Sequence, residues 1–403
     1  MTMATTMEIK SGSKILTDRI NRIQVSATMA VVAEACKLRE GGADLVDFGA
    51  GEPHFSTPEH IKAAAIEAIH QNFSKYTPVP GTQGLRKAIV ARHAADFGSQ
   101  YKPEESIAST GGKHALFNSI QVLVDHGDDV ILPVPYWVSF KDIIEYAGGR
   151  CILVETDEAK NFRLTAQMVE DAVTPRTKAI ILNSPNNPSG GVMTPEDLKS
   201  IVEFAHQRGI FVISDECYVY LNYTGARFSV GSITGAKEHL VIIGSLSKTY
   251  AMTGWRLGYA LAPAPIVAAM SKLQGQQTSN PASIVQKAAV EALSGQQQCI
   301  QEMRSEYIRL RDRIVPGLTA IPGITCTRPE GAFYAYPNIS HFLGRDGMRS
   351  AGDIAKRLLH EAHVVTVPGE AFGSGEHIRI SYATSEKEID RGLERMKRFF
   401  AAL

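Results

Sequence analysis

The stretch Ser245-Leu-Ser-Lys-Thr-Tyr-Ala-Met-Thr-Gly-Trp-Arg-Leu-Gly258 is the most informative part of the sequence. It follows a short apolar segment at 240–243, so we expect it at the carboxyl end of a buried strand, where ligands bind in open α/β sheets. The two serines Ser245 and Ser247, together with Lys248 and Arg256, fall within twelve residues. This group could cradle a phosphate around a nucleophilic amine, although a loop Lys is more commonly a solvated charge.

The segments around this stretch predict an α/β fold. Short apolar strands rich in β-branched residues are expected at 130–132, 179–182, 211–214 and 240–243. Helical periods are expected at 58–70, 198–208 and 284–293. Strands that are apolar on both faces are typical of a parallel sheet covered by helices. Beyond residue 322, strands at 364–367 and 378–382 alternate with a helix at 387–399, which predicts a smaller α+β domain. The Gln-rich segment 274–298 is a candidate domain boundary.

Composition narrows the function classes. The 403 residues contain 42 Lys and Arg against 42 Asp and Glu, without the basic excess of a nucleic-acid binder. The five cysteines show no CxxC spacing, so we expect neither a disulfide framework nor a zinc site. No apolar run is long enough to cross a membrane, and residues 1–15 do not resemble a signal peptide. A cytoplasmic enzyme without a membrane partner is the prediction.

Three further loops carry candidate site residues. Ser214-Asp-Glu-Cys-Tyr218 ends another apolar strand, so Asp215 could hold a cationic ring nitrogen or simply cap a helix. Ser109-Thr-Gly-Gly-Lys-His-Ala115 places two glycines before a helix, which offers backbone N–H groups to an anion. Asn183-Ser-Pro-Asn-Asn-Pro-Ser-Gly190 is the third loop. None of them matches a Walker A loop.

Together these loops resemble the class I/II pyridoxal-phosphate (PLP) aminotransferases of fold type I, and most closely the bacterial aspartate and prephenate aminotransferase subgroup. The resemblance runs from about residue 22 to residue 403. The other landmarks are Ala50-Gly-Glu-Pro53, Lys75-Tyr76, Gly81-Thr-Gln-Gly84, Pro135-Tyr-Trp137 and Ile378-Arg-Ile-Ser381. The resemblance implies a large domain with a mostly parallel seven-stranded sheet. It also implies an arm at 1–22, a small domain from 23–54 and 293–403, and a PLP-binding domain at 55–292.

The resemblance assigns cofactor roles to individual residues. Lys248 should form the Schiff base with PLP, and Asp215 should pair with the pyridinium nitrogen. The other expected cofactor contacts are Tyr218 and Asn187 at the phenolic oxygen, Trp137 on the ring, and Gly112, Lys113, Ser245, Ser247 and Arg256 at the phosphate. Tyr76 should reach the phosphate in the neighbouring subunit of a homodimer. Cis peptide bonds are expected before Pro135 and Pro188.

The substrate side is also implied by the resemblance. Arg379 should grip the α-carboxylate in a bidentate pair, assisted by Gly51, Asn187 and Trp137. Lys113 should bind a second carboxylate, or else serve only the phosphate. Thr28 matches another substrate-side position, whereas Gln24 replaces a basic residue of prephenate-using relatives. The lack of this basic residue favours L-aspartate or glutamate over prephenate as the substrate. The expected reaction is a ping-pong transfer of the amino group between L-aspartate, or glutamate, and 2-oxoglutarate. A prephenate or aromatic aminotransferase is the alternative, followed by a PLP-dependent C–S lyase.

Overall fold

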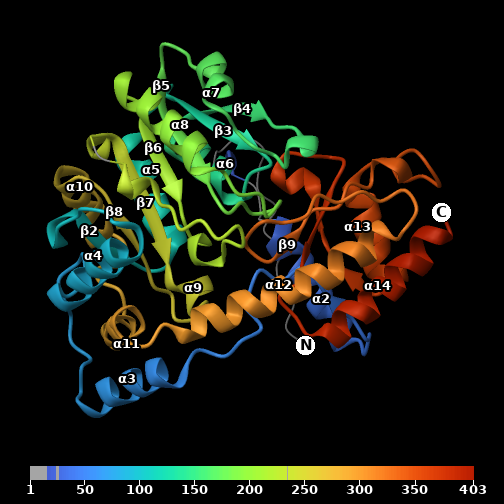
Figure 1. The fold of residues 1–403 in the computed structure, drawn as a ribbon, viewed down its shortest axis with the longest axis horizontal. Coiled ribbons are helices and arrows are strands. Elements are labelled where there is room, and N and C mark those ends of the chain that lie inside the picture. The colour runs from blue at the N-terminus through green and yellow to red at the C-terminus, as the bar shows by residue number, and fades with distance from the viewer. Residues whose placement is uncertain (1–15, 24–26, 234) are drawn as a thin grey trace, which may run out of the picture.

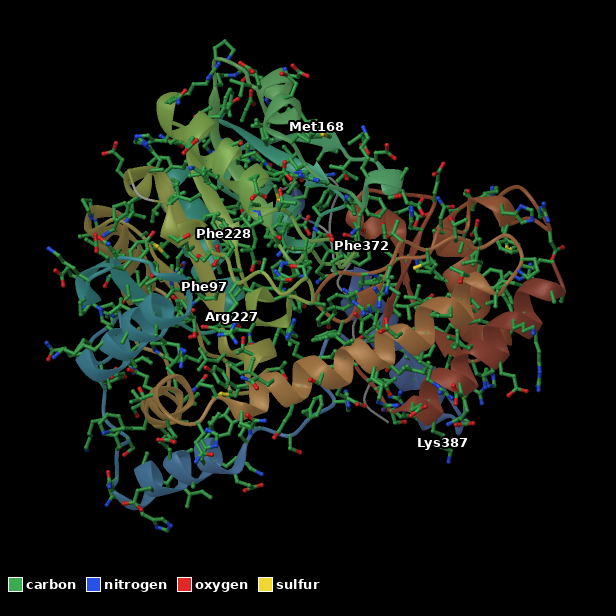
Figure 2. The ribbon with its side chains drawn as sticks, in the orientation of Figure 1. Phe97, Met168, Arg227, Phe228, Phe372 and Lys387 are labelled. Carbon is green, nitrogen blue, oxygen red and sulfur yellow. The ribbon has the colours of Figure 1, made fainter. Side chains whose placement is uncertain are left out.

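A sheet covered by helices occupies one end of the molecule, and the C-terminal helices occupy the other (Figure 1). The computed structural model describes residues 16–23, 27–233 and 235–403. The long helix α12 (Gln298–Thr319) extends from the sheet-bearing part into the C-terminal part. Phe372 lies between the two parts (Figure 2), where its carbonyl accepts a hydrogen bond from the Tyr136 amide at 3.1 Å.

The central sheet has seven strands in the order β2-β8-β7-β6-β5-β3-β4. Strand β8 runs antiparallel to its neighbours β2 and β7, and the other adjacent pairs are parallel. The bounds are β2 (Ser106–Ser109), β3 (Asp129–Val134), β4 (Arg150–Glu155), β5 (Thr177–Asn183), β6 (Phe211–Asp215), β7 (Leu240–Ser245) and β8 (Gly258–Leu261). The mostly parallel seven-stranded sheet expected from the sequence is therefore confirmed.

Both faces of this sheet are apolar, as the unbroken hydrophobic strands predict. Ile131 and Val212 face one helix layer, whereas Val130 and Ile213 face the other. The first layer consists of α3 (Glu59–His70), α4 (Gln83–Phe97), α7 (Ala166–Ala172), α8 (Pro195–Gln207) and α11 (Ser283–Ser294). The second consists of α5 (Gly112–Leu123), α6 (Ser139–Ala147) and α10 (Ala264–Gly275). Within the described ranges, no helix is both long and apolar enough to cross a membrane.

The C-terminal part contains two small sheets. Strands β11 (Val367–Pro368), β12 (Ile378–Ser381) and β9 (Tyr334–Ala335) form an antiparallel sheet, and β1 (Val46–Asp47) pairs in parallel with β10 (Val364–Val365). The single strand expected at 364–367 is therefore wrong, because the chain changes pairing partner at Thr366. The remaining helices are α1 (Asp18–Asn21), α2 (Ala27–Glu40), α9 (Leu246–Thr249), α13 (Ala351–Glu361) and α14 (Glu386–Ala401).

One helix boundary differs from the sequence expectation for a local reason. Helix α8 begins three residues before the expected residue 198, because Thr194 caps it by accepting a hydrogen bond from the Asp197 amide. The Gln-rich segment 274–298, the candidate domain boundary, contains a buried glutamine. Gln274 is buried and donates to the carbonyls of Val79 at 2.9 Å and Ala108 at 3.0 Å. These bonds join helix α10 to strand β2 and to the segment before α4.

Candidate active site

The candidate site lies where parallel strands of the central sheet end. Asn183 ends β5, Asp215 ends β6 and Ser245 ends β7, so the three expected loops leave the same edge of the sheet. Helix α5 begins at Gly112 beside them: a Cβ atom on Gly112 would lie 3.2 Å from the Cβ of Ser245. This topology brings together segments that are more than 130 residues apart in the sequence.

Lys248 lies on the short helix α9, directly after β7. The helix begins at a Ser245 cap, whose hydroxyl accepts a hydrogen bond from the Ser247 amide at 3.1 Å. The Lys248 ammonium donates to the carbonyl of Gly51. Burial lowers the pKa of Lys248 to about 8. At this pKa about a tenth of the amine is unprotonated at pH 7, far more than for an ordinary lysine, and only the unprotonated amine can act as a nucleophile or proton acceptor.

Asp215 is a buried carboxylate that fits a cationic partner. It is 5% exposed, and its Oδ1 accepts a hydrogen bond from the Cys217 amide at 3.0 Å. Burial raises the pKa of Asp215 to about 6. A protonated ring nitrogen placed against this carboxylate would compensate the cost of burying its charge. The next helix, η3 (Val219–Leu221), has Tyr218 and not Asp215 at its N-cap position. The buried Asp215 carboxylate could therefore serve as the partner of a pyridinium nitrogen.

An anion cradle lies between the start of α5 and Arg256. Gly111 has φ +89°, and a Cβ atom there would approach Arg256 Nη2 to 2.6 Å. A Cβ atom on Gly258 would lie 2.2 Å from the Gly112 amide nitrogen. The glycines thus allow backbone N–H groups and a guanidinium to converge, which is the arrangement that binds phosphate at a helix N-terminus. Ser245 and Ser247, both buried, end the neighbouring strand and begin α9.

Arg379 is the largest fully buried cation of the described chain, at 2% exposure. It lies on β12, and its guanidinium is 4.6 Å from the Tyr334 ring and 5.1 Å from the Phe372 ring. Nη1 donates to Asn187 Oδ1 at 3.1 Å and Nη2 donates to the Gly49 carbonyl at 2.8 Å. Among the described residues Nε has no partner. A buried cation with a free donor favours a carboxylate ligand.

Two buried tyrosine hydroxyls meet between the sheet-bearing part, which contains Tyr218, and the C-terminal part, which contains Tyr334. Tyr218 and Tyr334 share a hydrogen bond of 2.7 Å between their hydroxyl oxygens, and burial raises the pKa of both. A Cβ atom on Gly51 would lie 2.8 Å from the Tyr334 hydroxyl. Tyr334 and Phe372 were not predicted from the sequence. No local pattern marks them, because they join the site only through the pairing of β9 with β12 and the packing of residues 369–373.

Lys113, in the first turn of α5, lies beside Trp137, which is between β3 and α6. The Lys113 ammonium lies 4.9 Å from the centre of the Trp137 ring, and this ring packs edge-on against Phe140 at 5.5 Å. The peptide bond before Pro135 is cis, as expected. The expectation for Pro188 is wrong, because the second cis bond is Ser184–Pro185. The Pro185 ring packs against Gly331, a tertiary contact that the sequence does not reveal.

Several predicted residues lie away from this cluster or outside the described chain. Tyr76 is 92% exposed, so within one chain it is not part of the buried site. Gln24 and residues 1–15 of the predicted arm lie outside the described residues. Thr28 lies on α2, but its side chain is likewise outside the description. The other predicted site residues are brought together.

Comparisons with known proteins agree with this geometry. The family Aminotransferase class I and II matches residues 43–396. Aspartate aminotransferase of Geobacillus stearothermophilus is 42% identical over 389 residues, which cover 96% of this chain and 99% of that one. Aspartate/prephenate aminotransferase of Thermus thermophilus is also 42% identical, over 95% of this chain and 98% of that one. A solved structure of the Thermus thermophilus aspartate aminotransferase with maleate superposes with a TM-score of 0.92 at 41% identity, covering 96% and 100% of the chains.

A family match over most of the chain therefore coincides with a buried lysine, a buried carboxylate and an anion cradle at one sheet edge. The chain belongs to the class I and II aminotransferases, the PLP-dependent transaminases of fold type I.

Proposed function

We propose that this transaminase moves the amino group between L-aspartate, or glutamate, and 2-oxoglutarate by a ping-pong route. The proposal rests on two cationic groups of the candidate site in addition to Lys248. These are Arg379, buried against Asn187 and the Gly49 carbonyl, and Lys113, which lies beside Trp137. PLP, when bound, supplies an electrophilic aldehyde and an electron-accepting ring. Relatives named aspartate aminotransferase, and a related structure solved with the dicarboxylate maleate, support a dicarboxylate substrate.

The buried side chains of the site are suited to hold PLP. Lys248 would bind it through the aldehyde and would move the proton at the substrate Cα, which the lowered pKa of Lys248 favours. Asp215 would keep the ring nitrogen protonated. Tyr218 and Asn187 would donate to the phenolic oxygen, and Trp137 would pack on the ring. The phosphate would be held by the backbone amides of Gly112 and Lys113 and by Ser245, Ser247 and Arg256.

Arg379 binds the substrate α-carboxylate through two parallel N–H bonds, a geometry that its contacts with Asn187 and Gly49 already hold in place. Gly51 and Asn187 assist from the same wall, and Trp137 borders the substrate. Lys113 binds the distal carboxylate. A prephenate aminotransferase is the second candidate, and the name of the Thermus thermophilus relative favours it. No specific contact favours a C–S lyase.

The protein acts as a cytoplasmic homodimer in which Tyr76 reaches the phosphate of the neighbouring site. Its 92% exposure in one chain supports this role, since an aromatic ring of this size gains from being covered. Ile66 and Ile69 on the same segment are 55% and 56% exposed. They offer an apolar surface beside it.

We also propose that the chain is divided into an arm at 1–22, a small domain from 23–54 and 293–403, and a PLP-binding domain at 55–292.

The test is a titration of the PLP-loaded protein with L-aspartate in the absence of any keto acid, followed by visible absorption. The band of the lysine-bound cofactor should be replaced by the absorbance of the aminated cofactor, and 2-oxoglutarate should reverse the change. Phenylalanine and the amino acid formed from prephenate are titrated in parallel. A response to these without a response to aspartate would overturn the dicarboxylate assignment. Elimination products without an aminated cofactor would indicate a lyase.

A further inference from the structure

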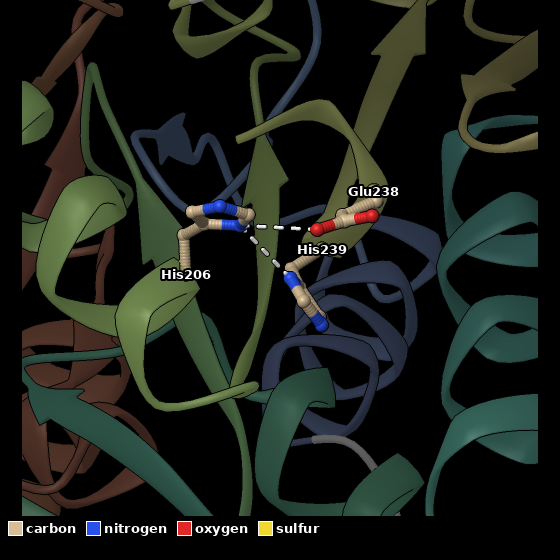
Figure 3. Close-up of side chains that lie close together, drawn as sticks. All are labelled: His206, Glu238 and His239. Carbon is tan, nitrogen blue, oxygen red and sulfur yellow. Dashed lines mark hydrogen bonds and ion pairs between the residues drawn. The ribbon is translucent and has the colours of Figure 1, made fainter. Parts of the chain in front are cut away.

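Three side chains that can ligate a metal, His206, Glu238 and His239, lie close together (Figure 3). They precede the strands β6 and β7, whose other ends carry the active site. His206 lies in the last turn of α8, which leads into β6. Glu238 and His239 lie on the short helix η5 (Lys237–His239), which leads directly into β7. Asp215 and Ser245 end these same two strands, so the cluster and the active site are separated by the length of the strands.

The ligand atoms have nearly the separations that a tetrahedral metal ion needs. His206 Nδ1 lies 3.0 Å from His239 Nδ1 and 3.8 Å from Glu238 Oε1, and all three atoms lie within 4.8 Å of one another. Metal–ligand bonds of about 2.0–2.1 Å place neighbouring ligand atoms of a zinc tetrahedron about 3.3 Å apart. Changes of well under an ångström in the two His206 distances would reach that geometry.

Rigid elements hold both imidazoles. His206 belongs to a 13-residue helix, and His239 directly precedes a fully buried strand. The His239 ring packs edge-on against Phe211 at 5.3 Å, and its centre lies 5.2 Å from that of the His206 ring. The two Nδ1 atoms face each other, so one must carry a proton that the other accepts. A metal ion can take the place of that proton and be bound by both nitrogens.

We propose that His206, Glu238 and His239 bind a divalent ion of a late first-row transition metal. Zn²⁺ is the ion used to test this proposal. Two imidazole nitrogens and a carboxylate oxygen suit this class of ion. Glu238 has a side-chain exposure of 71%, which leaves room for a water molecule in the fourth position. The ion ties the end of α8 to the start of β7, and so stabilises the folded state. The sequence spacing gave no sign of a metal site, because 33 residues separate the two histidines.

The experiment uses the PLP-loaded protein, stripped of metal with a chelator and kept free of amino acids, which would themselves bind Zn²⁺. Equilibrium dialysis should find one tightly bound Zn²⁺ per chain, and Zn²⁺ should raise the midpoint of thermal unfolding. In His239→Gln the affinity should fall at least about tenfold. In Glu238→Gln, whose side chain is largely exposed and makes little packing, the same loss should occur without any folding defect.

His360→Gln is the matched control. His360 is an exposed histidine paired with one carboxylate, Glu34, at 3.8 Å, but it is not part of a three-ligand cluster. This variant should bind Zn²⁺ and respond to it as the parent does. The proposal is overturned if the parent binds no Zn²⁺ at one per chain. It is also overturned if Glu238→Gln and His239→Gln bind as the parent does, or if His360→Gln loses the ion equally.

Discussion

The guanidinium of Arg379 donates a hydrogen bond to the side-chain oxygen of Asn187 across 3.1 Å, although 192 residues separate the two in the sequence. Arg379 lies on the small antiparallel sheet, and Asn187 lies in the loop after β5 of the central sheet. The bond therefore joins the two parts of the molecule at the site itself. Because Asn187 and Gly49 are neutral acceptors, the Arg379 charge remains available for a carboxylate.

Replacing Arg379 with Lys should lower kcat/KM for every amino-acid substrate by about 100-fold or more. Lys keeps the positive charge but cannot make two parallel hydrogen bonds, and a 100-fold loss corresponds to about 3 kcal/mol of lost bidentate binding in a buried site. Steady-state kinetics with aspartate and phenylalanine measure the effect. The visible band of the bound cofactor serves as the control and should persist. Unchanged kcat/KM would contradict the α-carboxylate role.

Replacing Lys113 with Met should discriminate between the two roles of that residue. Its ammonium lies 4.9 Å from the centre of the Trp137 ring. If it binds the distal carboxylate, kcat/KM for aspartate falls about tenfold or more while that for phenylalanine is unchanged, since only dicarboxylates lose a charged partner. Equal losses for both substrates, together with weaker cofactor binding, would contradict this role and indicate a contact with the phosphate alone.

Replacing Asp215 with Asn should stabilise the cofactor-free protein while abolishing most of its activity. The Asp215 pKa is about 6 when folded, against an ordinary 3.8, so the carboxylate increasingly costs folding stability as the pH rises from about 3.8 to about 6, and the full cost applies above that range. At pH 8 the folded variant should gain at most about 3 kcal/mol over the parent, and at pH 5 about half of that. Urea unfolding at both pH values measures the difference.

With the cofactor bound, the order should reverse, because a protonated ring nitrogen compensates the Asp215 charge and cannot do so in the variant. The loaded Asp215→Asn protein should therefore unfold at a lower temperature than the loaded parent. A stability difference that is independent of pH would contradict the raised pKa. A difference that keeps the same sign with and without cofactor would contradict the pairing with the ring.

The strands and the loops that follow them could be predicted from the sequence because their signals are local. Val130 and Ile131 lie on opposite faces of β3 and are both buried, so an unbroken apolar run marks the strand. Polar and glycine residues begin where each run ends, and the topology of a parallel sheet then gathers them. Lys248 and Asp215 are found in this way without any knowledge of distant contacts.

The rest of the site depends on contacts between distant segments. Tyr334 meets Tyr218 only because β9 pairs with β12, and the two-residue β9 is too short to leave a periodic signal. The residues before Pro185 and Pro188 are both small and polar, so the local sequence does not reveal which of the two peptide bonds is cis. The cis bond is the one before Pro185, whose ring packs against Gly331. Gln274 lies in a polar stretch but is buried by hydrogen bonds to segments far away in the sequence. Such features follow from tertiary structure alone.

Replacing Gly258 with Ala should damage the anion cradle, because the new Cβ would lie 2.2 Å from the Gly112 amide nitrogen. The backbone of either strand β8 or helix α5 must move, which should cost about 2 kcal/mol of unfolding free energy and weaken PLP binding. Gly254→Ala is the matched control, since a Cβ there has no atom within 4 Å. Unfolding curves and cofactor titrations of the two variants should differ; equal behaviour would contradict the close approach.

Mixing two inactive variants should test whether Tyr76 acts in the neighbouring subunit. Tyr76→Ala and Lys248→Ala are each expected to be nearly inactive as homodimers. If Tyr76 serves the partner site, a mixed dimer has one site with both changes and one with neither. Because random reassociation makes half of the dimers mixed, about a quarter of the sites should regain parental activity. If Tyr76 serves its own chain, every site retains one change and mixing restores nothing. Since Tyr76 is 92% exposed, the alanine variant should fold normally, and the recovered rate then reports the geometry of the dimer alone.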